Sequence, residues 1–401
     1  MDSSSVELME QNTSLIKSAE TMITNSLGKA IKFTSMERLT GPDGSKTLYR
    51  CFAASGSELL GTFIIKKAAG SLFSIENLSA WEVRGFLNDW MGAEFLSSLQ
   101  WNDPISPVFY GGDLNQGFFV LEDLGEHRSL VDPLLHGDAT MVEIGLLKYG
   151  ACLGTLHAMT AGKAGMFGAM FSAKFPDQRP FADEIHELGP RMKKVQLQLD
   201  QVGVPANSRL AGEIQVVTDA VSQPGPFLVF IHSDPCPDNL FDLGDRYRLI
   251  DFEYSHFGHA LLDVVHPRML WPGCWCANRI PDEMIARLEN RYRAELIQGC
   301  PKAEENAVWE SALVYMCGVT LLNRLSWDLE RALKEDPKQG LATIRQRLLA
   351  LLEAFIKTSE AFRRLPALCE AASQLLSLLQ VRWADTPPLP LYPAFDHPLA
   401  G

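Results

Sequence analysis

The sequence changes character at about Leu124. Before this point, short alternating apolar runs predict three strands, a helix and two further strands, at about 30–39, 47–54, 59–68, 78–99, 107–110 and 118–121. After it, amphipathic helical patterns dominate, at about 141–159, 182–202, 281–299, 304–329 and, with breaks, 341–379. We therefore expect an α+β chain with a small antiparallel sheet followed by a larger, mostly helical part.

Composition narrows the classes of protein to which the chain can belong. With 401 residues, 46% of them hydrophobic, it can bury a sizeable core, and it contains no apolar run of membrane-spanning length. The N-terminus lacks the pattern of a signal peptide, so we expect a cytoplasmic protein without membrane contact. Its eight cysteines are too sparse for a disulfide framework, and we expect them to be reduced. The net charge of −13 disfavours nucleic acid as a partner and mildly favours a cationic small molecule.

One segment interrupts the helical part, because 227–252 has the pattern of a strand, a loop and a hairpin. In it, Asp234 follows His232 by two residues and precedes Asn239 by five, and Asp251 comes twelve residues after Asn239. Carboxylate and amide oxygens are the ligands that Mg²⁺ prefers, and a carboxylate orients the attacking hydroxyl in phosphoryl transfer. Asp, Asn and Pro are also common in plain turns, but the His-x-Asp-x₄-Asn spacing with a following Asp-Phe favours a chemical role.

These residues carry a resemblance to a known family. His232 to Asn239, together with 250–253, resembles the catalytic and metal motifs of aminoglycoside phosphotransferases and choline kinases, and the resemblance covers most of the chain. Segment 153–158 resembles a helix end of that family, and Asp263 resembles the aspartate that supports its catalytic loop. The usual glycine after the histidine is Ser233 here, which is tolerable if the loop requires no positive φ at that position.

The resemblance implies a bilobal protein-kinase-like fold. Its parts would be an N-terminal nucleotide-binding lobe at 1–121, a hinge at 122–126 and a helical lobe at 127–401, with the catalytic loop within 227–253. It implies an enzyme that transfers the γ-phosphate of ATP or GTP to a hydroxyl of a small metabolite or antibiotic. Asp234 would be the catalytic base, and Asn239 and Asp251 would bind Mg²⁺.

The residues that would bind the nucleotide are less clearly indicated by the sequence. A lysine on the third strand is needed, and the family's apolar-apolar-lysine pattern favours Lys66 over Lys67. Asp89 is the chosen helical partner of this lysine, with Glu94 and Glu82 as rivals.

Two further segments complete the predicted nucleotide site. Ser45 belongs to a loop at 39–47 that resembles the phosphate-covering loop. The hinge backbone at Glu122 and Leu124 is expected to contact the adenine edge.

Two other functions fit the sequence less well. A protein kinase would carry an Ala-Pro-Glu signature after the metal motif, and none follows Glu253. A catalytically inactive nucleotide-binding module would have lost key residues, but Lys66, Asp234, Asn239 and Asp251 are all present. A zinc site is disfavoured because the Cys274-Trp-Cys276 spacing lacks the usual two-residue gap.

Overall fold

The computed structural model describes residues 8–10, 12–39, 46–55, 58–68, 81–99, 102–126, 128–176 and 183–395. The chain divides into two compact units, and each is described by itself below. Unit 1 comprises Met1–His127 and Arg248–Ser255, and unit 2 comprises Arg128–Tyr247 and His256–Gly401.

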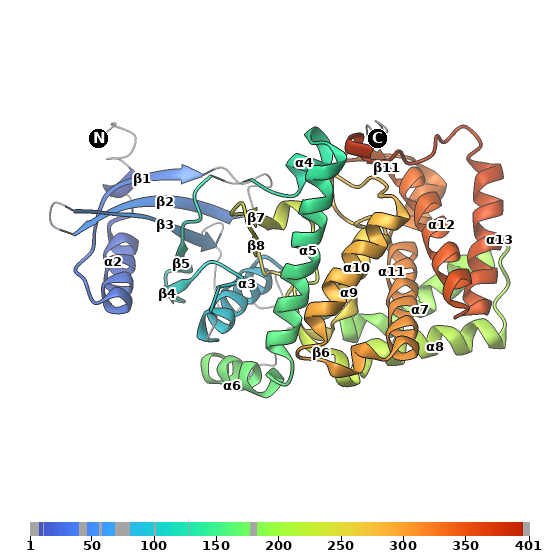
Figure 1. Cartoon of the computed structure of the whole chain (residues 1–401), viewed down its shortest axis with the longest axis horizontal. Coiled ribbons are helices and arrows are strands. Elements are labelled where there is room, and N and C mark those ends of the chain that lie inside the picture. Colours follow the sequence, from blue (N-terminus) through green and yellow to red (C-terminus); the bar gives the residue numbers. More distant parts are fainter. Residues whose placement is uncertain are drawn as a thin grey trace. The chain divides into compact units, whose positions relative to one another are not determined.

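Unit 1 is built on a five-stranded sheet in which all neighbouring strands are antiparallel and the order is β1-β2-β3-β5-β4 (Figure 1). The elements of this unit are α2 (Thr13–Leu27), β1 (Lys32–Leu39), β2 (Lys46–Ser55), β3 (Glu58–Ala68), α3 (Trp81–Ser98), β4 (Phe109–Asp113) and β5 (Phe118–Glu122). The predicted order of three strands, a helix and two strands is confirmed. Helix α2 was not predicted.

Helix α2 covers one face of the sheet because its apolar residues recur at helical spacing (Figure 1). Leu15, Ile16, Ala19 and Ile23 join a core cluster with residues from β1, β2, β3 and β5. On the same helix, the buried Glu20 accepts a hydrogen bond from Phe33 N at 2.8 Å, which fixes the start of β1 against the helix. The helix therefore completes the core of unit 1.

A short distant segment also belongs to unit 1. Leu249, the last residue of β8 (Tyr247–Leu249), donates its N–H to Ile105 O at 2.8 Å. Arg248 pairs with Glu122 at 2.7 Å, and the Phe252 side chain is only 1% exposed. The sequence pattern had placed this segment in the helical part. Its contacts lie within the sheet unit, so it belongs to unit 1.

Unit 2 is mostly helical, as predicted. Its longer helices are α5 (Ala139–Thr160), α7 (Asp183–Gln201), α8 (Ser208–Ser222), α10 (Asp282–Leu296), α11 (Asn306–Lys334), α12 (Ile344–Phe362) and α13 (Pro366–Arg382). Its shorter elements are α4 (Val131–His136), α6 (Ala164–Lys174), β6 (Leu228–Ile231), β7 (Leu240–Asp242), β9 (His256–His259), α9 (Leu261–Arg268), β10 (Lys338–Gln339) and β11 (Ala342–Thr343). Strands β6 and β9 pair antiparallel and flank the predicted catalytic loop in sequence.

Two glycines allow α5 and α10 to pack side by side (Figure 1). A Cβ at Gly150 would lie 2.7 Å from Leu288 O, and one at Gly154 would lie 2.6 Å from Tyr292 O. Both distances are shorter than any normal contact, so the helix backbones approach as closely as only glycine permits. Since Gly150 and Gly154 are four residues apart, they lie on one face of α5.

The proline-rich C-terminal segment is extended and packed up to residue 395, because Leu389 and Tyr392 are buried and Tyr392 N donates to Arg279 O at 3.0 Å. One expectation about the second half of the chain was wrong. The cysteines are not all reduced, since Cys236 and Cys274 form a disulfide with a Cα–Cα distance of 5.8 Å. Among the described residues, no helix has the length and apolar character needed to cross a membrane.

The close approach of α5 and α10 predicts a large effect of one methyl group. Gly154→Ala should lower the free energy of unfolding by about 1–3 kcal/mol, because the added Cβ forces the two backbones apart. Urea unfolding followed by circular dichroism measures this change. The matched control is Gly168→Ala in α6, where a Cβ meets nothing within 4 Å. This control should be neutral or stabilising by up to about 1 kcal/mol, and equal destabilisation of both variants would contradict the packing argument.

Candidate functional site

In unit 1, the candidate nucleotide residues form a buried cluster of charges. Lys66 lies in β3 and is 8% exposed, and its Nζ lies 2.7 Å from Asp89 Oδ2 and 3.3 Å from Asp251 Oδ1. Asp89, on α3, is 1% exposed, whereas the Asp251 side chain is 33% exposed. Removing these charges from water is costly, so their mutual attraction and hydrogen bonds have to hold the cluster together. Lys66 is thereby held beside the partly exposed carboxylate of Asp251.

The residues after Asp251 lock this cluster in place. Asp89 Oδ1 accepts a hydrogen bond from Phe252 N at 2.9 Å, so one carboxylate contacts both the lysine and the metal-motif backbone. Asp251 itself has a φ of 69°, a left-handed conformation that is unfavourable for a residue with a side chain. The Phe252 side chain packs where α3 has Gly92, since a Cβ there would lie 2.7 Å from Phe252 Cβ. Backbone strain at Asp251 is thus offset by contacts of its neighbour.

The rivals of Lys66 and Asp89 are placed differently. Lys67 follows Lys66 in β3, so its side chain points to the opposite face of the sheet. Glu94 accepts a hydrogen bond from Trp90 Nε1 at 2.6 Å, and Glu82 is exposed in the first turn of α3. The Lys66–Asp89 pair is therefore present, while its role in nucleotide binding stays a prediction. Ser45 lies outside the described residues.

The predicted hinge is held by an arginine that sequence reasoning missed. Arg50 donates to both carboxylate oxygens of Asp123, at 2.5 and 3.2 Å, and to Gly125 O at 2.7 Å. Burial alone raises the pKa of the Asp123 carboxyl, but the hydrogen bond from Arg50 outweighs it and the pKa lies below its usual value. The signal in the sequence was a lone charge in the apolar run of β2.

The backbone groups of two hinge residues, Glu122 and Leu124, are predicted to contact the adenine edge. Glu122 N already donates to Val108 O at 2.8 Å, so this N–H is used within unit 1. The Glu122 side chain pairs with Arg248. Leu124 follows the end of β5, and its contact with an adenine edge stays a prediction.

In unit 2, the candidate catalytic loop is anchored on the buried Asp263 in α9. Asp263 Oδ2 accepts from His232 N at 2.7 Å, and Oδ1 accepts from Ser233 N at 2.9 Å. His157 Nε2 lies 3.1 Å from Oδ2, and all these groups except Ser233 are fully buried. Burial raises the pKa of the Asp263 carboxyl, but the hydrogen bond from His157 outweighs it, so the pKa lies below its usual value. The expected contact between Asp263 and the loop is present.

Ser233 shows why glycine is usual at this position. Its φ is 63°, so the loop does require a positive φ, and the serine adopts a conformation that costs about 1–2 kcal/mol. The Asp263 hydrogen bond to Ser233 N and a 3.3 Å contact between Ser233 Oγ and His256 Nδ1 hold it there. Serine in place of the usual glycine was expected to be tolerable only if this position needed no positive φ. The structure shows that it does need one.

Asp234 and Asn239 lie at the two ends of one tight loop. Asn239 Nδ2 donates to Asp234 O at 2.9 Å and lies 3.2 Å from Asp234 Oδ2. These bonds orient the Asn239 amide so that its Oδ1 points away from Asp234. Asn239 N also donates to Cys236 O at 3.0 Å, which closes the loop from inside. A carboxylate and an amide oxygen are thereby presented from a single rigid turn.

The loop is also tied to the turn that follows α9. Pro235 O accepts from Tyr149 Oη at 3.1 Å and from Trp271 Nε1 at 3.2 Å. Cys236 is bonded covalently to Cys274, and Trp275 Nε1 donates to Asp238 at 2.8 Å. Sequence reasoning had not connected these residues, because no local pattern joins positions almost forty residues apart.

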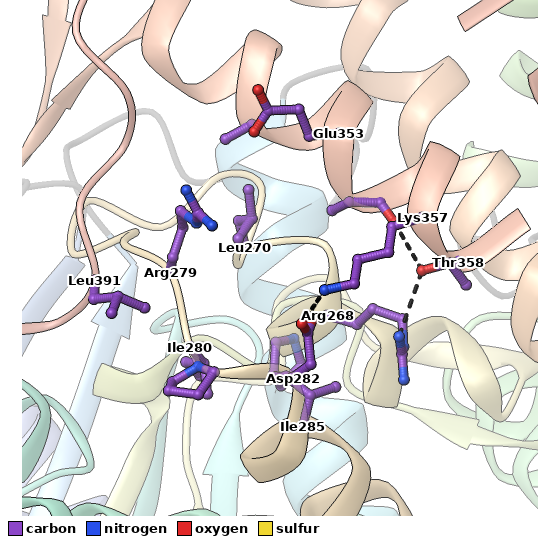
Figure 2. Close-up of a pocket in the computed structure, with 14 residues that line it drawn as sticks. Arg268, Leu270, Arg279, Ile280, Asp282, Ile285, Glu353, Lys357, Thr358 and Leu391 are labelled. Carbon is purple, nitrogen blue, oxygen red and sulfur yellow. Dashed lines mark hydrogen bonds and ion pairs between the residues drawn. The ribbon is translucent and has the colours of Figure 1, made fainter. Parts of the chain in front are cut away.

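A separate cavity of about 140 Å³ lies in unit 2 between α9, α10, α12 and the C-terminal segment (Figure 2). Its charged lining is largely paired: Lys357 with Asp282, and Arg268 with Glu289 at 2.6 Å. In Figure 2, Thr358 contacts Arg268 on the same side of the cavity. None of the motif residues lines it.

The buried charge cluster predicts a stability effect. Asp89→Ala should lower the free energy of unfolding by about 3 kcal/mol, because it leaves the buried Lys66 with a single, more distant carboxylate. Chemical denaturation measures this change. Glu82→Ala on the same helix is the control, and at its exposed position it should change stability by less than about 0.5 kcal/mol. A similar effect of the two substitutions would contradict the buried-pair interpretation.

Buried histidines in unit 2 predict acid sensitivity. Burial lowers the pKa of His259 to about 3 and that of His266 to about 4. In the unfolded chain both titrate near 6.5, so the unfolded state binds more protons between about pH 4 and 6.5. Stability should therefore fall as pH drops below 6.5, by up to about 1.4 kcal/mol per pH unit for each histidine.

The contribution of one histidine can be isolated. His259→Asn keeps an acceptor for Leu261 N and removes one titrating group. Urea unfolding at several pH values between 7.5 and 5 measures how the free energy of unfolding changes with pH. In this variant the free energy should change less steeply, by an amount that corresponds to about one bound proton. An unchanged slope in this variant would show that His259 does not titrate on unfolding.

Comparisons with known proteins bear on the family of the chain. Residues 95–299, which are half of the chain, match the family model described as "Phosphotransferase enzyme family". No curated protein is similar enough to the chain to count as a relative.

Several solved structures are also similar to the chain. A choline/ethanolamine kinase family protein from Mesorhizobium loti is 14% identical, with a TM-score of 0.40, over 86% of this chain and 92% of that one. A choline kinase from Cryptosporidium parvum Iowa II is 13% identical, with a TM-score of 0.46, over 94% and 100%. The ADP-bound aminoglycoside phosphotransferase APH(2'')-Ib is 14% identical, with a TM-score of 0.43, over 83% and 96%.

These TM-scores lie below 0.5, so the assignment depends on the family model and on the motifs that it includes. The matched residues contain the predicted catalytic loop, Asp251 and Asp263. The chain therefore belongs to the phosphotransferase enzyme family, as the sequence predicted.

Proposed function

We propose that this phosphotransferase transfers the γ-phosphate of ATP or GTP to a hydroxyl group of a small molecule, with Asp234 as the catalytic base. The observation that carries the proposal is the buried Lys66 held between Asp89 and Asp251. A cation fixed in this way is suited to bind phosphate oxygens, and its second carboxylate begins the metal motif. Family membership supports the reaction class.

The donor set fits Mg²⁺. Asp251 offers a partly exposed carboxylate, and Asn239 offers an amide oxygen turned away from its hydrogen-bonded nitrogen. Both are hard oxygen ligands of the kind that Mg²⁺ prefers, and we assign them to metal binding. When bound, the metal would neutralise charge that develops on the phosphates.

The protein groups would then divide the work. Lys66 would bind the phosphates, while Asp89 holds the lysine in orientation. Asp234 would accept the proton of the attacking hydroxyl, and its loop would hold the carboxylate in position through Asn239 and Asp263. Most of the rate enhancement would come from positioning and electrostatics, because phosphoryl transfer asks little covalent chemistry of the protein.

The acceptor is proposed to be a small metabolite or antibiotic, with cationic molecules favoured. The net charge of −13 raises the local concentration of cations near the protein. This bias acts at long range and does not select one compound.

The test combines a substrate search with two variants. The protein is incubated with Mg-ATP or Mg-GTP and a panel of aminoglycosides, peptide antibiotics, choline-like amines and sugars, and products are detected by a mass gain of about 80 daltons. With the acceptor found, Asp234→Asn should lower kcat by about 10²–10⁴-fold, because the proton acceptor is lost. Asp251→Asn should lower activity comparably, because a metal ligand is lost.

A control comes from the same hairpin. Asp245 is exposed and pairs with its neighbour Arg246, so Asp245→Asn should leave turnover unchanged. Unchanged turnover in both the Asp234 and Asp251 variants would refute the mechanism. Nucleotide binding without phosphorylation of any acceptor or hydrolysis would instead favour a catalytically inactive binding protein.

A further inference from the structure

A covalent bond lies next to the proposed base. Cys236 is two residues after Asp234, and its Sγ lies 3.1 Å from Asp234 Oδ1. The disulfide to Cys274 joins the loop to a turn 38 residues further along the chain. The other six cysteines are free, so this is the one sulfur pair in the described part of the chain that a reductant can open.

The turn that carries Cys274 is anchored independently of the loop. Arg347 of α12 is buried and donates to Cys274 O at 2.8 Å and to Gln339 O at 2.6 Å. Trp275 O accepts from Leu341 N at 2.8 Å, and Gly340 lies so close that a Cβ there would meet this oxygen at 1.9 Å. One end of the disulfide is therefore fixed to the helical part of unit 2.

Reduction changes the space that the sulfurs need. Bonded sulfur atoms are about 2 Å apart, whereas non-bonded heavy atoms need about 3.5–4 Å. Both side chains are buried, at 6% and 4% exposure, so little room is available to absorb the difference. Because Arg347 holds the Cys274 turn, Cys236 and the loop that carries Asp234 have to take up part of the shift.

We propose that Cys236 and Cys274 are a redox-reversible positioning pair, in which the disulfide holds Asp234 in its productive geometry and reduction lowers turnover. The proposal rests on the proposed function of Asp234. In the reductive step, a small thiol attacks one sulfur, the S–S bond breaks and the other cysteine leaves as a thiolate. A second thiol then resolves the mixed disulfide. Two electrons pass from the two thiols to the protein, which gains two protons, and a small-molecule disulfide is released. An excess of that disulfide reverses the reaction.

The experiment compares the same protein in two redox states. After treatment with oxidised glutathione, peptide mapping should find 236 linked to 274 and six alkylatable cysteines. After dithiothreitol, it should find eight. In the reduced form, kcat for the acceptor identified by the panel should fall at least about tenfold while the nucleotide KM changes little, since displacing a reacting group by about 1 Å costs up to 10²-fold. Reoxidation should restore kcat.

Two variants separate this pair from general redox effects. Cys236→Ser combined with Cys274→Ser should abolish the redox response of kcat. Cys276→Ser, which removes a free buried cysteine two residues further on, should retain that response. Eight free thiols after oxidation, equal or higher kcat on reduction, or a response that persists in the double variant would overturn the proposal.

A readout independent of catalysis guards against failure of the proposed function. If neither redox state phosphorylates any acceptor, hydrogen exchange of the loop amides at 232–239 still tests whether the disulfide positions the loop. Faster exchange on reduction in the wild type, absent in the double variant, supports the positioning role. Identical exchange in both redox states overturns it.

Discussion

The buried carboxylate of Asp263 is the constraint on which the candidate catalytic loop depends. It accepts hydrogen bonds from two successive backbone N–H groups, at His232 and Ser233, at the point where the chain leaves β6. A backbone N–H buried without a partner costs as much as a lost hydrogen bond, so this carboxylate determines where the chain turns. His157 in turn fixes the carboxylate from α5. The left-handed φ of Ser233 persists because both neighbouring peptide groups are held.

Unit 1 also contains a buried charge that fixes the backbone around it, but here the central charge is positive. There a buried cation, Lys66, is the centre, and the carboxylate of Asp89 divides its two oxygens between this cation and Phe252 N. Asp251, like Ser233, has a positive φ and is held by its neighbours. In each unit, a strained residue of the motif lies beside a buried carboxylate that accepts at least one hydrogen bond from the backbone of the motif. Strain of this kind concentrates where function requires a fixed geometry.

Much of this arrangement was accessible from the sequence, and the exceptions have physical causes. The strands of the sheet and the longer helices follow hydrophobic periodicity, and the motif residues follow fixed spacing, so both were found. Helix α2 was missed because its short apolar stripe precedes any motif. Arg50, Arg347 and the Cys236–Cys274 bond were missed because they join segments far apart in sequence. The positive φ of Ser233 could be suspected from the usual glycine, but only its backbone contacts decide it.

The membership of Arg248–Ser255 in unit 1 has a consequence for how the molecule is divided. The sheet unit is not encoded by one continuous stretch, since eight of its residues are supplied after more than a hundred residues of the helical unit. Those eight include Asp251 and Phe252, which complete the charge cluster around Lys66. Expression of the first 127 residues alone would therefore leave the lysine without its second carboxylate. Exchange of the sheet unit between related enzymes has to transplant two pieces of chain together.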